Sequence, residues 1–201
     1  MKELLKKYIN IKAWGTFLLA NALAFVAWQN LDTSTTGIYR LFPLLGLFAF
    51  STMWGHYMVW ALRDWSGAPE VPMYSKITQY FVLLCLLLHP ALFIYQLNKD
   101  GLGLPPASYE AYLGKSLVPF VFLGMVSLFA FLAYEFKKWL SGKKVWKYIL
   151  IANHIAMIAI LIHGFRLGSV IENTYFYFVW IAYAFSLGVV LFYLGSKKKL
   201  V

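Results

Sequence analysis

The chain has 201 residues, of which 61% are hydrophobic and 13% are charged. Soluble domains are about half apolar and about a quarter charged, so this composition excludes an ordinary soluble protein and indicates an integral membrane protein. The formal net charge of +10 is spread over short segments between apolar runs, which is typical of membrane orientation signals and lipid contact, so we expect no nucleic acid partner.

Six apolar runs are long enough to cross a membrane as helices, which takes roughly 20 residues for about 30 Å of hydrocarbon. They cover about residues 11–30, 41–62, 77–97, 117–137, 147–168 and 174–195. Because they use nearly the whole chain, the sequence predicts an all-α integral membrane protein with one domain over residues 1–201, a six-transmembrane-helix bundle. Before the first run, the basic amphipathic segment 1–10 is predicted to lie at the membrane surface.

The basic residues are distributed unevenly between the two sides of the predicted bundle. Fourteen lie in the N-terminal segment, the second and fourth loops and the C-terminal tail, and four lie on the other side, namely Arg40, Lys99, Lys115 and Arg166. Lysine and arginine are enriched in cytoplasmic loops. We therefore expect both termini to be cytoplasmic, in a multi-pass protein of the cytoplasmic (inner) membrane.

All four histidines lie inside predicted spans. His56 is on the second, His89 on the third, and His154 and His163 are both on the fifth. Ionisable residues are costly inside a membrane and indicate a functional site. Neutral imidazole is the usual axial ligand of b-type haem, and a bis-histidine site takes one imidazole from each of two facing helices.

Depth along the helices groups the histidines at two levels. At 1.5 Å per residue, His89 lies roughly 18 Å and His163 roughly 24 Å from the cytoplasmic end, so we expect these two to ligate the iron of a haem b. His56 and His154 lie roughly 9 and 10 Å deep. Both are candidates for a second haem. His56 is also a candidate for a hydrogen bond to a quinone or for carrying protons, and His154 for a contact with Asn153 or another polar group. However, His154 and His163 are nine residues apart, so they point to opposite faces of their helix.

Two polar residues near the outer histidines are candidate partners of haem propionates. Arg166 lies one turn beyond His163, and Gln96 lies two turns beyond His89. An equally good interpretation of Arg166 is an arginine whose side chain extends to the membrane surface.

Three segments carry a resemblance to a known family. TGIYRLFPLLGLFAF opens the second span, YFVLLCLLLHPALF holds His89, and WKYILIANHIAMIAILIHGF has a tryptophan seventeen residues before His163. Over about residues 35–170, this pattern resembles the ferric reductase-like transmembrane domain family. It is most similar to small stand-alone bacterial members such as the haem-binding membrane subunit of the periplasmic methionine sulfoxide reductase system.

The resemblance implies a haem b held by His89 and His163. Family members with two haems carry a second histidine on each of these helices, about thirteen or fourteen residues nearer the cytoplasm. Here those positions are Ser75 or Lys76 and Ile149 or Leu150, so the family's usual inner haem lacks its ligands.

The resemblance also implies an electron-transfer function, as an oxidoreductase component. Larger relatives carry a soluble FAD- and NADPH-binding domain, but this chain has no glycine-rich nucleotide fingerprint. We therefore expect electrons from quinol or from a separate flavoprotein, and an acceptor such as ferric iron, a periplasmic redox partner or oxygen. The alternative is a haem-free membrane transporter or assembly subunit, whose histidines transfer protons or merely pack.

Overall fold

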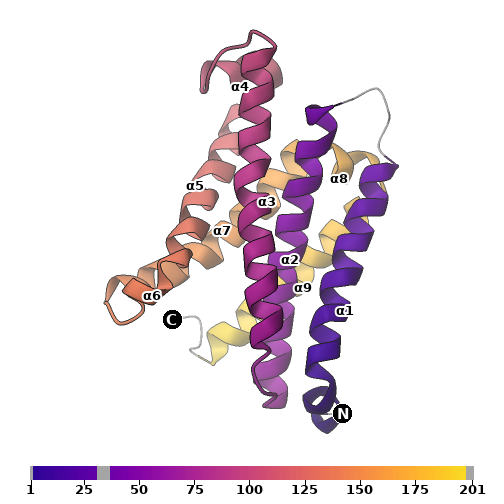
Figure 1. Ribbon diagram of the computed structural model, residues 1–201, viewed down its shortest axis with the longest axis vertical. Coiled ribbons are helices and arrows are strands. Elements are labelled where there is room, and N and C mark those ends of the chain that lie inside the picture. The colour runs from indigo at the N-terminus through magenta and orange to yellow at the C-terminus, as the bar shows by residue number, and fades with distance from the viewer. Residues whose placement is uncertain (1, 31–36, 198–201) are drawn as a thin grey trace.

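The computed structural model describes residues 2–30 and 37–197, and every regular element in these ranges is a helix. The long helices are α1 (Lys2–Gln29), α2 (Ile38–Ser66), α3 (Pro72–Lys99), α5 (Val118–Glu135), α7 (Val145–Leu167) and α9 (Phe176–Ser196) (Figure 1). Shorter helices occur in three connections, α4 (Ala107–Leu113), α6 (Lys137–Leu140) and α8 (Ser169–Asn173).

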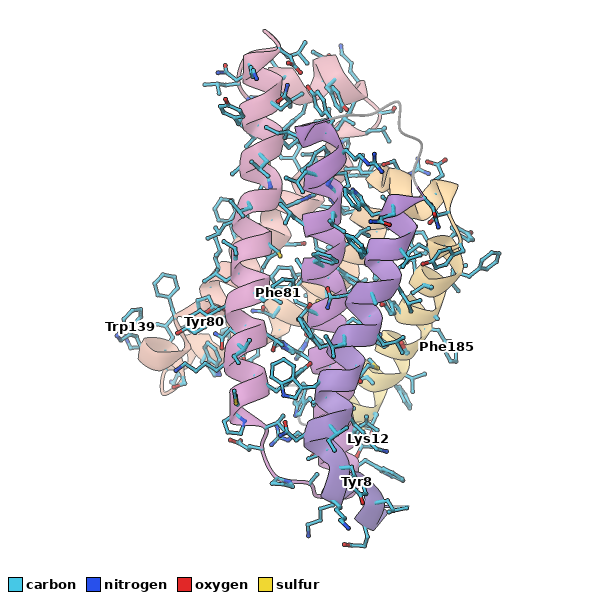
Figure 2. All side chains as sticks on the ribbon, turned by 45° about the vertical axis from the view of Figure 1, so that its right-hand side comes forward. Tyr8, Lys12, Tyr80, Phe81, Trp139 and Phe185 are labelled. Atoms are coloured by element: carbon cyan, nitrogen blue, oxygen red, sulfur yellow. The ribbon has the colours of Figure 1, made fainter. Side chains whose placement is uncertain are left out.

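Five helices in the described ranges are long and apolar enough to cross a membrane, namely α1 from Lys6 onward, α3, α5, α7 and α9. Large side chains extend away from the bundle into the surroundings, as Tyr80 and Phe185 show (Figure 2), and these two are 62% and 75% exposed. Apolar surface of this kind suits contact with lipid. The protein is therefore an all-α multi-pass membrane protein.

The predicted span 41–62 lies within the 29-residue helix α2. Helix α2 is not one of the five helices that are apolar enough to cross a membrane. Its middle carries Ser51, Thr52 and His56, and its last turns carry Arg63 and Asp64, which lower its mean hydropathy. Helix α2 instead lies between α1 and α3 and packs along both (Figure 1). Its polar side chains are therefore covered by neighbouring helices.

Helix α9 joins the two halves of the bundle. It packs against α2 and also touches α7. Trp180 is the centre of this junction, because its ring lies 4.3 Å from that of Phe50 and its Nε1 donates to the carbonyl oxygen of Leu161 at 3.2 Å. Gly164 leaves space for the same indole, since a Cβ there would collide with it. The result is a tightly packed core behind the face of α7 that carries Gly164.

The two ends of the bundle differ. Helix α4 lies at one end, and α6 lies toward the other, as does the first turn of α1 (Figure 1). At the α6 end, Asp64 of α2 accepts hydrogen bonds from Tyr193 and Lys197, at 3.0 and 3.2 Å. Hydrogen bonds to Tyr193 and Asp64 raise the pKa of Lys197. The last turn of α9 is thus tied to the last turn of α2.

Two connections to the predicted spans have regular structure. Residues 2–10, from the segment predicted to lie at the membrane surface, are the start of α1, which has a break in helical geometry at Tyr8 (φ −110°, ψ 17°). The long connection after α3 contains the short helix α4. The first connection, over residues 31–36, and the basic Lys198 and Lys199 lie outside the described residues.

Candidate functional site

Two histidines from different helix pairs face each other in the half of the bundle nearer α4. His89 lies on α3 and His163 on α7, and their ring centroids are 6.5 Å apart with an interplanar angle of 77°. Helix α3 packs along α2, and α7 packs along α5. The structure therefore brings together His89 and His163, the two histidines predicted to lie at a similar depth.

A backbone carbonyl of the neighbouring helix holds each imidazole. Nδ1 of His89 lies 2.6 Å from the carbonyl oxygen of Phe42, and Nδ1 of His163 lies 2.8 Å from that of Phe120. Because a carbonyl oxygen can only accept, Nδ1 carries the proton on both rings. Nε2 of each ring then has the lone pair, which is the form in which a neutral imidazole binds a metal.

Both rings rest on the same short motif, Phe-x-x-x-Gly, at residues 42–46 of α2 and 120–124 of α5. A Cβ on Gly46 would lie 2.9 Å from Cε1 of the ring it supports. A Cβ on Gly124 would lie 2.8 Å from Cε1 and from Nδ1 of its ring. Packed atoms do not approach this closely, so glycine is needed to let the imidazole lie against the helix.

Aromatic side chains cover the histidine pair on the side of α4. The ring of Phe42 lies 5.5 Å from that of His89, and Phe93 stacks on Phe42 at 4.6 Å. Tyr109 of α4 stacks on Phe93 at 5.9 Å, with an interplanar angle of 5°. Burial raises the pKa of Tyr109, so its hydroxyl stays neutral. Helix α4 thus packs over the aromatic layer that covers the pair.

The two predicted propionate partners have different surroundings. The guanidinium of Arg166 lies 5.0 Å from the ring centroid of Phe120, the residue whose carbonyl holds His163. Gln96 instead donates to Asp100 at 2.8 Å, and the same carboxylate accepts from Tyr39 at 2.6 Å. Arg166 is therefore exposed and lies over the ring of Phe120, whereas Gln96 belongs to a hydrogen-bond cluster near the α4 end.

The other two histidines each have a hydroxyl partner. Nε2 of His56 lies 2.6 Å from Oγ1 of Thr78. Nδ1 of His154 lies 2.7 Å from the hydroxyl of Tyr57, and its ring is nearly parallel to that of Trp60 at 6.4 Å. Both histidines line a cleft toward the α6 end.

The geometry of His89 and His163 suits one metal ion between two imidazoles. Metal–nitrogen bonds of about 2 Å on both sides would set the ring centroids about 6 Å apart, close to the separation found. No group of three or more His, Cys, Asp or Glu side chains that could hold a metal ion occurs in the described ranges. With only two protein ligands, the metal would need its remaining ligands from a cofactor such as a porphyrin.

Sequence reasoning missed the residues that position the pair. These residues are Gly46, Gly124 and the backbone carbonyls of Phe42 and Phe120. The repeated Phe-x-x-x-Gly spacing is present in the sequence, but the spacing is common in apolar runs. The spacing indicates a site only where the histidine of a neighbouring helix packs against the glycine.

Comparison with known proteins does not place the chain in a family. No protein-family model matches it, and neither a curated protein nor a solved structure matches it. A function must therefore be argued from the geometry of the site.

Proposed function

We propose that this protein holds one haem b between His89 and His163 and transfers electrons across or within the cytoplasmic membrane. The observation that carries the proposal is the facing imidazole pair, with Nδ1 of each ring on a backbone carbonyl. These hydrogen bonds leave the lone pair of each ring at Nε2, the form in which a neutral imidazole binds a metal. A structural histidine that merely packs has no need for a facing partner of the same tautomer.

The chain's own residues would position the cofactor and exclude water. Haem supplies one-electron chemistry, and the protein tunes it through the axial ligands, their hydrogen bonds and burial. The carbonyls of Phe42 and Phe120 make the imidazoles stronger donors by accepting their Nδ1 protons. Phe42, Phe93 and Tyr109 close the side toward α4. Arg166, which lies over the ring of Phe120, is the candidate cation for a propionate.

One haem is favoured over two. His56 and His154 were candidates for a second site, but each makes a short hydrogen bond to a hydroxyl group, from Thr78 or Tyr57. The described residues show no second pair of facing imidazoles. We therefore assign iron ligation to His89 and His163 alone and leave the other two histidines for a different role.

The distribution of charge supports a membrane orientation. We propose that α2 is the sixth span, buried between α1 and α3, and that the α6 end faces the cytoplasm. Its length of 29 residues corresponds to roughly 43 Å, which is more than the hydrocarbon thickness. Electrons would enter from quinol or a separate flavoprotein and leave outward, to ferric iron, a periplasmic redox partner or oxygen.

Cysteine labelling in intact cells tests this orientation. In a Cys85→Ser background, which removes the one cysteine, Ser116→Cys lies near α4 and Ser141→Cys lies near α6, and both native serines are exposed. A membrane-impermeant maleimide should label Ser116→Cys in intact cells and Ser141→Cys only after permeabilisation. The opposite pattern would show that the bundle is inverted.

Visible spectra of the purified protein test the haem itself. Oxidised protein should show a Soret band, and dithionite should produce the sharp α-band of a low-spin b-type haem. Haem content should be close to one per chain. A protein that folds and purifies from haem-replete cells without these bands would refute the proposal and leave a haem-free role.

A further inference from the structure

A cleft between α2, α3, α5 and α7 does not include either histidine of the pair. Its volume is about 630 Å³, within the range of small-molecule sites. The residues that matter most for its chemistry are His56, Tyr57, Trp60, Phe131, His154 and Met157. Most of the lining is apolar, with a few polar groups that converge on it.

The cleft begins close to the histidine pair. Leu86, three residues before His89, and Met157, six residues before His163, both line it. These spacings correspond to about 5 and 9 Å along the helix axes. A planar molecule in the cleft would therefore lie within a short electron-transfer distance of a metal held by the pair.

Toward the α6 end, helix α5 leans away from α3 (Figure 1). Gln79 of α3 donates to Glu135 of α5 at 2.8 Å, which bridges the two helices beside the cleft. Both of these side chains line the cleft and are exposed. A molecule dissolved in the membrane would thus have a route in between the two helix pairs.

The tautomer of His56 can be worked out from its neighbours. Oγ1 of Thr78 donates to the carbonyl oxygen of Tyr74 at 2.7 Å, so it must accept the hydrogen bond from His56. Nε2 of His56 is therefore protonated, and Nδ1 carries the lone pair. This ring can accept a proton at Nδ1 while Thr78 keeps it oriented.

The charges of the cleft argue against a nucleotide. Arg63 is the one cationic side chain among the described lining residues, and it already contacts Glu70 at 3.7 Å and the carbonyl oxygen of Pro69 at 3.0 Å. A flavin or nicotinamide nucleotide carries phosphates that need cations or free backbone N–H groups. An apolar ring with hydroxyl groups needs neither.

We infer that this cleft binds a membrane hydroquinone and that His56 accepts a proton from it. The inference rests on the proposed haem, because the electrons need an acceptor. Oxidation of one hydroquinone to the quinone breaks two O–H bonds and releases two electrons and two protons. The two electrons would go one at a time to a haem held by His89 and His163. One proton goes to Nδ1 of His56, and the other goes to the Tyr57–His154 pair.

Two measurements on the full-length protein in nanodiscs test the inference. In the first, decyl-hydroquinone is mixed with oxidised protein, and reduction is followed at the haem α-band. His56→Phe keeps a ring but removes Nδ1, so it should slow reduction by about 100-fold, the lower range for a lost general base. Trp139→Ala, on α6 outside the cleft, should reduce at the wild-type rate.

In the second measurement, a photoreactive azido-quinone is cross-linked to the protein and the labelled peptides are mapped. We expect labels within residues 53–63 of α2 and 150–157 of α7, reduced by excess decyl-quinone. Unchanged reduction of His56→Phe, or labels elsewhere, would overturn the inference even if dithionite shows a normal haem. Labelling of the cleft in a protein without haem bands would instead support the quinone site and overturn the proposed electron acceptor.

Discussion

His89→Ala and His163→Ala are each expected to give a folded protein that purifies with less than about a tenth of the wild-type haem. Loss of an outer-sphere hydrogen bond to a metal ligand typically costs about 10–100-fold in metal affinity, and loss of an axial ligand itself costs more. Haem content by the pyridine haemochrome assay, per mole of chain, is the measurement.

The fold should survive these two substitutions. The carbonyl of Phe42 loses its bond from His89, but within α2 it still accepts from the backbone N–H of Gly46, four residues later. The same holds for Phe120 and Gly124 in α5. His56→Phe serves as the matched control and should retain full haem. If both alanine variants kept full haem, the ligands would lie elsewhere.

The two supporting glycines should be nearly as sensitive as the ligands. In Gly46→Ala and Gly124→Ala, the new Cβ lies under 3 Å from the imidazole, so the ring must turn or move out. Overpacking costs about 1–3 kcal/mol, more than the roughly 0.5–1 kcal/mol that alanine contributes inside a helix. We expect a partly high-spin spectrum and weaker haem retention.

Two other helical glycines provide the control for this series. A Cβ on Gly15 of α1 or on Gly188 of α9 meets no atom within 4 Å. Gly15→Ala and Gly188→Ala should therefore keep the wild-type spectrum and be neutral or slightly stabilising. If all four variants behaved alike, the effect would come from helix propensity, and the close approach of the glycines to the imidazoles would have no role.

Most of the helical architecture could be predicted because apolar length is a local property. The spans read from residues 77–97 and 174–195 correspond to α3 and α9, and the errors are a few residues at the ends. The span at 41–62 shows the limit of this reasoning. Helix α2 can carry polar residues such as Thr52 and His56 because it packs between neighbouring helices. That packing cannot be predicted from the composition of a single segment.

The histidine site was predictable in part for a related reason. Depth along a helix follows from residue number, so His89 and His163 could be matched. Partners across helices depend on rotation and tilt, so the hydroxyls of Thr78 and Tyr57 were not foreseen for His56 and His154. Gln96 was predicted as a candidate partner of a haem propionate, but its amide donates to Asp100 on the following turn.

The most direct test of the account is low-temperature EPR of the oxidised protein. Two imidazoles on ferric iron give a low-spin signal. When their planes are nearly perpendicular, two of the iron d orbitals are almost equal in energy, which makes the signal strongly anisotropic. The 77° angle between His89 and His163 predicts this signal, with its lowest-field feature at an unusually high g value. An axial high-spin signal as the main species, or no haem signal at all, would contradict ligation by this pair.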